Sequence, residues 1–186
     1  MAVLNAVKET RLALIVALGG MLAGVMPGQT ADEYQVKAAY MYNFAKFVDW
    51  PAEVFDSPAQ PLVFCVLGPT PLSRVLGETL AGKMLDRRPL VYRPLTDSSQ
   101  AAKCQVLFIG FPDKSRLRQT LDEVKSFHVL TVGEREDFTA EGGIVRFVMD
   151  AGRVRLEFNL DAADDAKLRV SAKLLGLAKV VRRAGK

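Results

Sequence analysis

The sequence is poor in the residues with which many enzymes and metalloproteins work. Its 186 residues include one histidine, two cysteines and one tryptophan. A Ser-His-Asp or Cys-His arrangement would have to use His128 or do without histidine altogether. No cysteine and histidine have the spacing of metal ligands. We therefore expect a protein that is not an enzyme and that needs no metal and no cofactor.

The sequence also lacks a strong excess of charge of either sign. Its 25 basic and 21 acidic residues nearly balance, and the net charge is only +4. A nucleic-acid-binding protein would show a stronger basic stripe and a recognisable reading element. The acidic residues Asp161, Asp164 and Asp165 have the spacing of a first helical turn, where the helix dipole favours them without any bound cation. The turn Gly68–Pro71 contains two prolines, which lack backbone donors, so it is a poor phosphate site.

Long hydrophobic runs are missing except near the start of the chain. There, Lys8 and Arg11 precede the uncharged run 12–26, which is too short to span a bilayer comfortably and resembles the apolar region of a secretory signal. An uncleaved N-terminal anchor is the alternative, because no clean cleavage triplet occurs.

We expect residues 1–31 to form a signal peptide, cleaved between Gly24 and Asp32. The remaining residues, 32–186, would form a single exported domain that does not insert into the membrane, because no later apolar run is long enough to do so.

The two cysteines, Cys65 and Cys104, both lie in apolar runs typical of strands. Export makes a disulfide between them plausible, and closing so long a loop would contribute roughly 4 kcal/mol in the chain-entropy model. Two separate buried thiols are the alternative, since free cysteine is among the most buried residue types.

Apolar runs of strand length alternate with helical patterns through the middle of the chain, which indicates a βα layout with a largely parallel sheet. The expected strands are Leu62–Leu67, Leu90–Arg93, Lys103–Phe111 and Val129–Val132. The expected helices are Leu72–Leu80, which ends at Gly82, and Ser115–Lys125.

The C-terminal part has a different pattern. Ile144–Met149 and Arg153–Phe158 flank Asp150–Gly152, which supplies the glycine of a tight hairpin, so these strands should be antiparallel. Asp161 is expected to cap a short helix after them. The fold class is therefore α/β, with a mixed sheet of five or six strands, a parallel core and a C-terminal antiparallel hairpin, covered by helices.

The segment Lys37–Pro51 combines a helical pattern with many aromatic residues. An apolar stripe is predicted on this helix at Val36, Tyr40, Phe44 and Phe47. Proline at position 51 should end the helix, because it disfavours the α conformation of the residue before it. Trp50, at that end, is a candidate exposed anchor for a partner, since tryptophan is enriched where binding energy concentrates. Its alternative role is a lid on the core.

The last helix, capped by Ser171, is the second candidate surface. Its predicted apolar face is too broad to pack against one sheet, so one side should pack against the fold and the other against a partner or a second copy of the chain. The face consists of Leu174, Leu175, Leu177, Ala178 and Val181. Arg169 and Lys173 beside it would steer an acidic partner, or are ordinary solvated cations.

Seven blocks occur in the order found in a known family. They are Lys37–Pro51, Gly82–Lys83, Arg88–Leu90, Cys104–Ile109, Val129–Val132, Glu141–Phe147 and Ser171–Leu175. From about Glu33 to about Arg182, the chain resembles the YfiR family of small periplasmic proteins. The family tends to carry a second cysteine pair toward the C-terminal half, which this chain lacks.

The resemblance implies a repressor in cyclic di-GMP signalling and biofilm control. Family members bind the periplasmic sensory domain of an inner-membrane diguanylate cyclase and hold it inactive, and an outer-membrane lipoprotein sequesters them and so releases the cyclase. The rival hypothesis is a periplasmic small-molecule-binding module, in which Trp50 and Arg169 line a pocket for an aromatic or anionic ligand.

Overall fold

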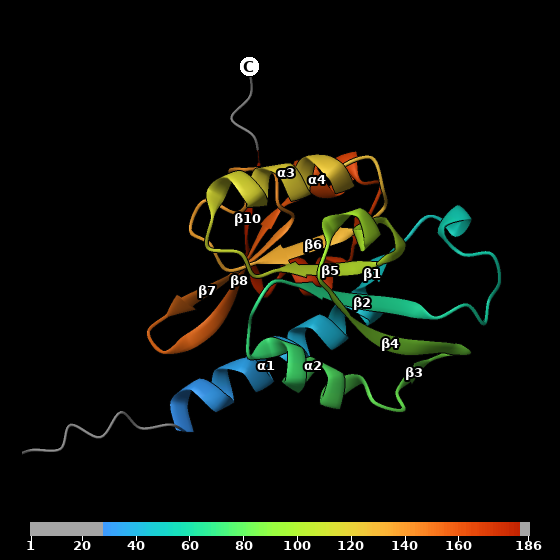
Figure 1. Ribbon diagram of the computed structural model, residues 1–186, viewed down its shortest axis with the longest axis horizontal. Helices are drawn as coiled ribbons and strands as arrows, with labels where there is room; N and C mark the ends of the chain where they lie inside the picture. The colour runs from blue at the N-terminus through green and yellow to red at the C-terminus, as the bar shows by residue number, and fades with distance from the viewer. Residues whose placement is uncertain (1–27, 183–186) are drawn as a thin grey trace, which may run out of the picture.

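An eight-stranded sheet runs through the part of the chain that the computed structural model describes, residues 28–182, and helices cover both of its faces (Figure 1). The strand order is β10-β8-β7-β6-β5-β2-β4-β3. The strands of this sheet are β2 (Leu62–Leu67), β3 (Met84–Leu85), β4 (Arg88–Leu95), β5 (Val106–Ile109), β6 (Leu130–Gly133), β7 (Val145–Asp150), β8 (Arg153–Asn159) and β10 (Ala178–Val181).

The remaining elements connect these strands or cover them. The α-helices are α1 (Gly28–Phe47), α2 (Leu72–Leu80), α3 (Lys114–Val124), α4 (Leu160–Asp165) and α5 (Ala172–Leu175). Two 3-10 helices, η1 (Ala52–Val54) and η2 (Ser98–Lys103), lie in connections. The short strands β1 (Val48–Asp49) and β9 (Arg169–Val170) form a separate two-stranded sheet.

Strand directions confirm the predicted fold class. Strands β4, β2, β5, β6 and β7 are parallel, while β7 and β8 form the predicted antiparallel hairpin, with Ala151 and Gly152 at positive φ in its turn. The sheet has eight strands where five or six were expected. The additional ones include the two-residue β3 at one edge and β10, which runs parallel to β8, at the other.

Aromatic packing fixes α1 on one face of the sheet, beside α2 (Figure 1). The ring centroid of Phe44 lies 6.4 Å from that of Phe147 and 6.2 Å from that of Phe158, so one helix residue joins both strands of the hairpin. Helix α3 packs on the opposite face through Leu117 and Leu121. Both faces of the parallel strands are therefore buried, as their continuous apolar sequences require.

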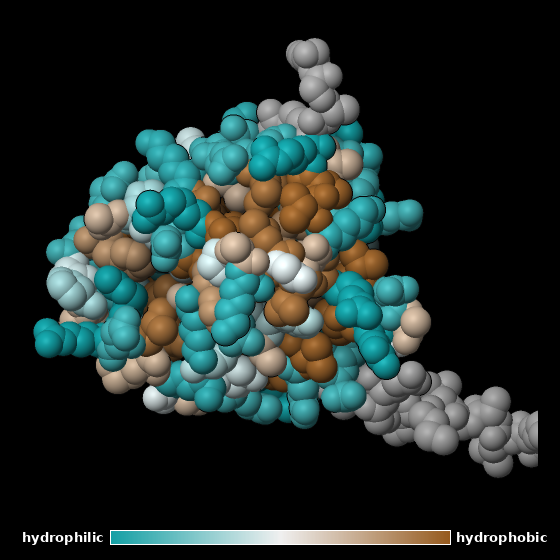
Figure 2. Space-filling view, turned by 180° about the vertical axis from the view of Figure 1, so that it is seen from behind, coloured by the Kyte–Doolittle hydropathy of each residue, from teal (hydrophilic) through white to brown (hydrophobic). Residues whose placement is uncertain are grey.

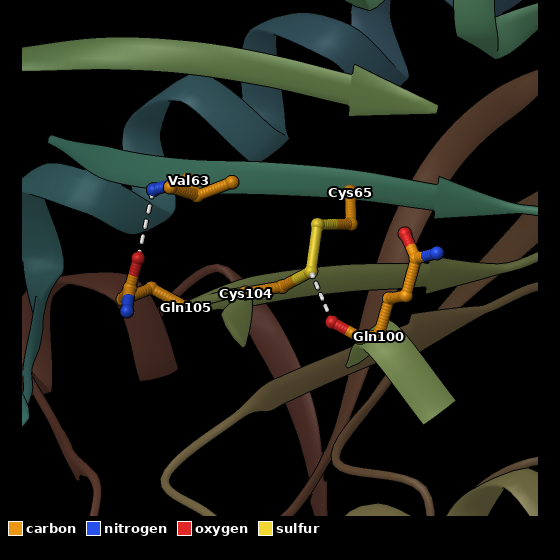
Figure 3. Close-up of a disulfide and its surroundings, with 5 residues drawn as sticks. All are labelled: Val63, Cys65, Gln100, Cys104 and Gln105. Carbon is orange, nitrogen blue, oxygen red and sulfur yellow. Dashed lines mark hydrogen bonds between the residues drawn. A yellow bond between two sulfur atoms is a disulfide. The ribbon is translucent and has the colours of Figure 1, made fainter. Parts of the chain in front are cut away.

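The predicted disulfide between Cys65 and Cys104 is present (Figure 3). It joins β2 to the residue just ahead of the β5 segment, on the face covered by α3, with 5.9 Å between the two Cα atoms. Both residues are almost completely buried. The bond therefore lies within the apolar core between the sheet and α3, and it holds two adjacent parallel strands together.

The aromatic helix differs from its prediction in two ways. It ends at Phe47 rather than at Trp50, because Val48 and Asp49 form strand β1. Val36 is 37% exposed, whereas Lys37 is 2% exposed. The Lys37 ammonium group is accommodated there by Glu33 and by Glu134, the latter at 2.9 Å. The other three residues of the predicted stripe, Tyr40, Phe44 and Phe47, do pack against the core. Apolar periodicity does not reveal a buried ion pair, so the sequence pattern placed Val36 rather than Lys37 on the inner face.

The predicted last helix is wrong beyond its first turn. Ser171 caps it as expected, but α5 ends at Leu175, and the chain then pairs as β10 with β8. Gly176 follows the helix and weakens its continuation, while the β-branched pair Val180 and Val181 favours a strand.

Two smaller predictions also change. Asn159, not Asp161, caps α4, since its side-chain oxygen accepts the N–H of Ala162 at 3.1 Å. The strand expected at Lys103–Phe111 is shorter. It is β5 (Val106–Ile109), and Lys103 is the last residue of the 3-10 helix η2.

Positions 1–27 of the expected signal peptide lie outside the described residues. Among the helices of the described part, none has both the length and the apolar character needed to cross a membrane.

We expect the double variant Cys65→Ala/Cys104→Ala to lose about 2–5 kcal/mol in its free energy of unfolding, because the disulfide restricts the unfolded chain. Urea titration of the oxidised wild type and the variant measures this loss. The wild type, unfolded without reductant, should show no titratable thiol. Equal stabilities, or two free thiols, would contradict the assignment.

Candidate partner-binding surface

Two segments that are far apart in sequence meet in the small β1–β9 sheet. Val48 is paired with Val170, and Asp49 is paired with Arg169. The N–H of Ser171 then donates to the carbonyl oxygen of Phe47 at 2.9 Å. The end of the aromatic helix therefore lies beside the start of the C-terminal segment, which places the two predicted surfaces next to each other.

Trp50, the predicted anchor, follows β1 directly and is half-buried. Its ring packs against the core that lies between helices α1 and α2 and the sheet. Its indole Nε1 is buried without a hydrogen-bond partner among the described residues. Arg169, by contrast, has a side chain that is 85% exposed, and its guanidinium group lies 3.9 Å from the Asp49 carboxylate. An exposed Arg169 does not enclose a pocket with Trp50 in this conformation.

Lys173 joins the same region, because its ammonium group lies 5.4 Å from the centroid of the Phe47 ring. Three of the predicted partner-binding residues, Trp50, Arg169 and Lys173, thus gather around β1 and β9. Two of them are exposed cations beside a partly exposed aromatic ring, a combination found at the rims of protein interfaces.

The other four predicted residues separate into buried and exposed positions. Leu174 is only 2% exposed and belongs to the core, and Leu175 is half-buried against it. Leu177 is 61% exposed, and Val181 is half-buried on β10. The structure therefore moves Leu174 from the predicted surface into the interior, while Leu177 faces solvent.

Strand β10 forms one edge of the large sheet and, within residues 28–182, pairs on one side only, with β8. Val180, on this strand, is 41% exposed. Figure 2 shows hydrophobic side chains gathered in the upper part of the face that is seen from behind. An edge strand of this kind carries unpaired backbone donors and acceptors and is a template for pairing with another chain.

A groove of about 440 Å³ lies beside this edge, over the β7–β8 hairpin. Leu177 and Met149, which is 48% exposed, both line it, together with the charged residues Arg155 and Lys179. Val180 does not line the groove, because it lies on the other face of the sheet at the same edge. We call the three exposed apolar residues along this edge, Leu177, Met149 and Val180, the edge patch. Apolar groups rimmed by charges are typical of surfaces that bind other proteins.

Glu157, on β8, links the hairpin to β10 through an ion pair. Its carboxylate accepts the Thr139 hydroxyl at 2.6 Å and lies 3.2 Å from Arg146 and 3.5 Å from Lys179 of β10. Burial is the largest influence on its pKa and raises it, but the hydrogen bond and the two cations together outweigh burial. The pKa of Glu157 therefore lies below its ordinary value of 4.5.

Comparison with known proteins agrees with this fold. The crystal structure of a conserved domain protein from Vibrio cholerae O1 biovar El Tor str. N16961 matches with a TM-score of 0.54 and 12% sequence identity, over 81% of this chain and 60% of that one. The chain thus spans about 60% of that protein's length, and the likeness concerns the fold alone. A weaker match, with a TM-score of 0.44 and 11% identity over 64% of this chain and 55% of the other, is the ABC domain in complex with L-Trp from Streptococcus pneumonia.

Residues 34–179 match the model of the YfiR/HmsC-like family. The match covers most of the chain, including the β1–β9 sheet and the first half of β10, and the chain belongs to this family. The family consists of periplasmic regulatory proteins connected with cyclic di-GMP signalling.

The sequence reasoning missed two features of this surface. Val180 was not placed on it, because the residues after Gly176 have the pattern of a helix, and Met149 becomes part of it only because β10 pairs with β8 beside the hairpin. The adjacent β-branched residues Val180 and Val181 were the available signal for a strand. The β1–β9 pairing was not predictable in the same way, since two-residue strands leave no periodic pattern.

The division between buried and exposed leucines has a direct consequence for stability. Leu174→Ala should lower the free energy of unfolding by about 2–5 kcal/mol, because it leaves a cavity in the core. Leu177→Ala should change it by no more than about 0.5 kcal/mol. Urea denaturation of both variants tests this, and similar losses from the two substitutions would contradict the assignment of the segment.

Glu157 should make stability depend on pH in the acid range. Because its pKa is depressed in the folded state, its contribution is complete above its ordinary pKa of 4.5 and is lost as the pH falls through the lower folded value. Between about pH 5 and pH 3, the wild type should lose more unfolding free energy than Glu157→Gln. Parallel losses in the two proteins, measured by urea unfolding at each pH, would rule out this role.

Proposed function

We propose that this chain is a periplasmic repressor that binds the periplasmic sensory domain of an inner-membrane diguanylate cyclase and holds the cyclase inactive. An outer-membrane lipoprotein sequesters the chain and so releases the cyclase. Family membership supports the setting. The single observation that carries the choice of surface is the exposed apolar edge strand, with Leu177 at 61% and Val180 at 41% exposure.

Strand addition is the form of binding that this edge supports. A partner strand would pair with the free side of β10 through main-chain hydrogen bonds, and its side chains would contact Leu177 on one face of the sheet and Val180 on the other. Arg169 and Lys173, on the neighbouring β1–β9 sheet and helix α5, would attract acidic groups of the partner.

The energy required is compatible with this small surface. Switching a sensory domain from mostly active to mostly inactive requires about 5.5 kcal/mol of difference in affinity between its two conformations. Full burial of an exposed leucine, valine or methionine contributes about 1.5–3 kcal/mol. The three side chains of the edge patch are 61%, 48% and 41% exposed, so their burial contributes roughly 2–4 kcal/mol, and main-chain hydrogen bonds to β10 supply the rest. A partner conformation that presents no strand to β10 would lose this contribution.

Release by a competitor follows if the lipoprotein covers the same edge. A sheet edge accepts one added strand, so two partners that use β10 exclude each other. A second copy of this chain is another occupant of the same edge, and a homodimer formed there would store the protein in a form that cannot bind the cyclase.

Leu177→Asp should raise cellular cyclic di-GMP in cells that produce the cyclase, because a charge on the edge patch opposes its burial by the partner. The substitution is at an exposed site and should leave the amount of periplasmic protein unchanged. Measurement of cyclic di-GMP by mass spectrometry, with immunoblotting of the periplasmic fraction, tests this expectation.

Met84→Asp is the matched control. Met84 is 55% exposed on β3, at the opposite edge of the same sheet, so the new charge is comparable but lies far from β10 in the strand order. Cyclic di-GMP should stay at the wild-type level in this variant. A rise with Met84→Asp equal to that with Leu177→Asp, or no rise with Leu177→Asp at normal protein levels, would refute the proposed surface.

A further inference from the structure

A second groove, of about 510 Å³, opens at the amino ends of β2, β5 and β6, on the face of the sheet that carries the disulfide. Its volume lies within the range of about 300–1,000 Å³ that is usual for small-molecule sites. Val54 and Gln60, from the connection between β1 and β2, form one wall. None of its lining residues belongs to the edge patch or to the β1–β9 sheet.

Gln105 provides a fixed hydrogen-bond donor in this groove. It is 6% exposed, and its side-chain oxygen accepts the N–H of Val63 at 2.8 Å (Figure 3). Because that backbone group must donate, the oxygen and nitrogen of the amide are assigned without ambiguity. The amide nitrogen points away from Val63 and has no partner among the described residues, although Gln105 lines the groove. This nitrogen is therefore free to donate a hydrogen bond to an acceptor on a ligand in the groove.

The charged groups that line the groove are all positive. Arg93 and Lys103 contribute their side chains, and neither forms an ion pair or hydrogen bond with any residue in the range 32–182. His128 also lines the groove, and its Nδ1 donates to the carbonyl oxygen of Ala166 at 2.9 Å, so its Nε2 is left for another partner. No aspartate or glutamate lines the groove. Two cationic side chains, Arg93 and Lys103, and an amide donor without a neighbouring carboxylate favour an anion.

The rest of the lining is apolar. Val63 and Val91 come from adjacent strands, and Phe127 is 43% exposed, an unusual position for a phenyl ring. A fully hydrated anion such as phosphate would leave these side chains without a partner. A ligand with a flat apolar body and one anionic group satisfies both parts of the lining.

We propose that this groove binds a small aromatic monocarboxylate. The carboxylate lies against Arg93 and the amide nitrogen of Gln105, and the aromatic ring packs against Phe127 and the two valines. This site is separate from the proposed partner-binding surface and does not depend on the proposed function.

Isothermal titration of the oxidised full chain with 3-phenylpropionate tests the site. Three further probes separate its parts: 3-phenylpropanol lacks the charge, acetate lacks the ring, and inorganic phosphate is an anion without an apolar body. We expect 3-phenylpropionate to bind at least about tenfold more tightly than each of them, since each lacks one of the two recognised groups.

Arg93→Gln should weaken the binding of 3-phenylpropionate about tenfold, through loss of a charge-assisted contact. Phe127→Ala should weaken it through loss of the ring contact, and both residues are exposed enough for the fold to tolerate the changes. Arg153→Gln, an exposed arginine on the hairpin that does not line the groove, is the matched control and should bind as the wild type does.

Nuclear magnetic resonance gives a readout at the site itself. The side-chain amide signals of Gln105 should shift on addition of 3-phenylpropionate in the wild type and in Arg153→Gln. Binding of phosphate as tight as that of 3-phenylpropionate would overturn the proposal. So would equal affinities of Arg93→Gln and the wild type, or the absence of any heat or shift at a ligand concentration of about 10 mM.

Discussion

Burial of the parallel strands on both faces determines where the rest of the chain can bind a partner. Helix α1, through the Phe44 contacts, and helix α2, through its buried leucines, cover one face, and α3 covers the other, which also carries the disulfide. The two edge strands of the sheet remain accessible. At one edge, β3 is only two residues long, a feature that limits pairing with other chains. At the other, β10 has four residues and carries the exposed side chain of Val180, so this edge is where association can occur.

Much of this architecture could be predicted from the sequence, because buried strands and amphipathic helices leave periodic patterns. The continuous apolar run Leu62–Leu67 and the spacing of the leucines in Leu72–Leu80 gave these elements with their boundaries. The glycine of the hairpin turn and the cap at Ser171 have local conformational causes, so they were also predictable. The cysteine pair followed from burial and export, although a second outcome was open.

The features that escaped prediction depend on contacts between distant segments. Lys37 occupies an apolar position because Glu134, nearly a hundred residues away, pairs with it. Trp50 and Arg169 come together through a pairing of only two residues in each strand, β1 and β9. Leu174 and Leu177 looked equivalent on a helix, and only the pairing of β10 with β8 separates a buried leucine from an exposed one. Apolar residues of a segment can thus be recognised from the sequence, but which of them are exposed depends on these long-range pairings.

In the proposed scheme, one edge of the sheet binds the partner, and the groove beside the disulfide binds a small aromatic monocarboxylate. The central claim of this scheme is that the edge patch contacts the cyclase in the periplasm. Photo-crosslinking from benzoylphenylalanine placed at position 177, with position 84 as the reference, measures this contact directly. We expect an adduct with the cyclase's periplasmic domain from position 177 only, and its loss when the lipoprotein is overproduced. Equal adducts from both positions, or none from position 177, would contradict the account.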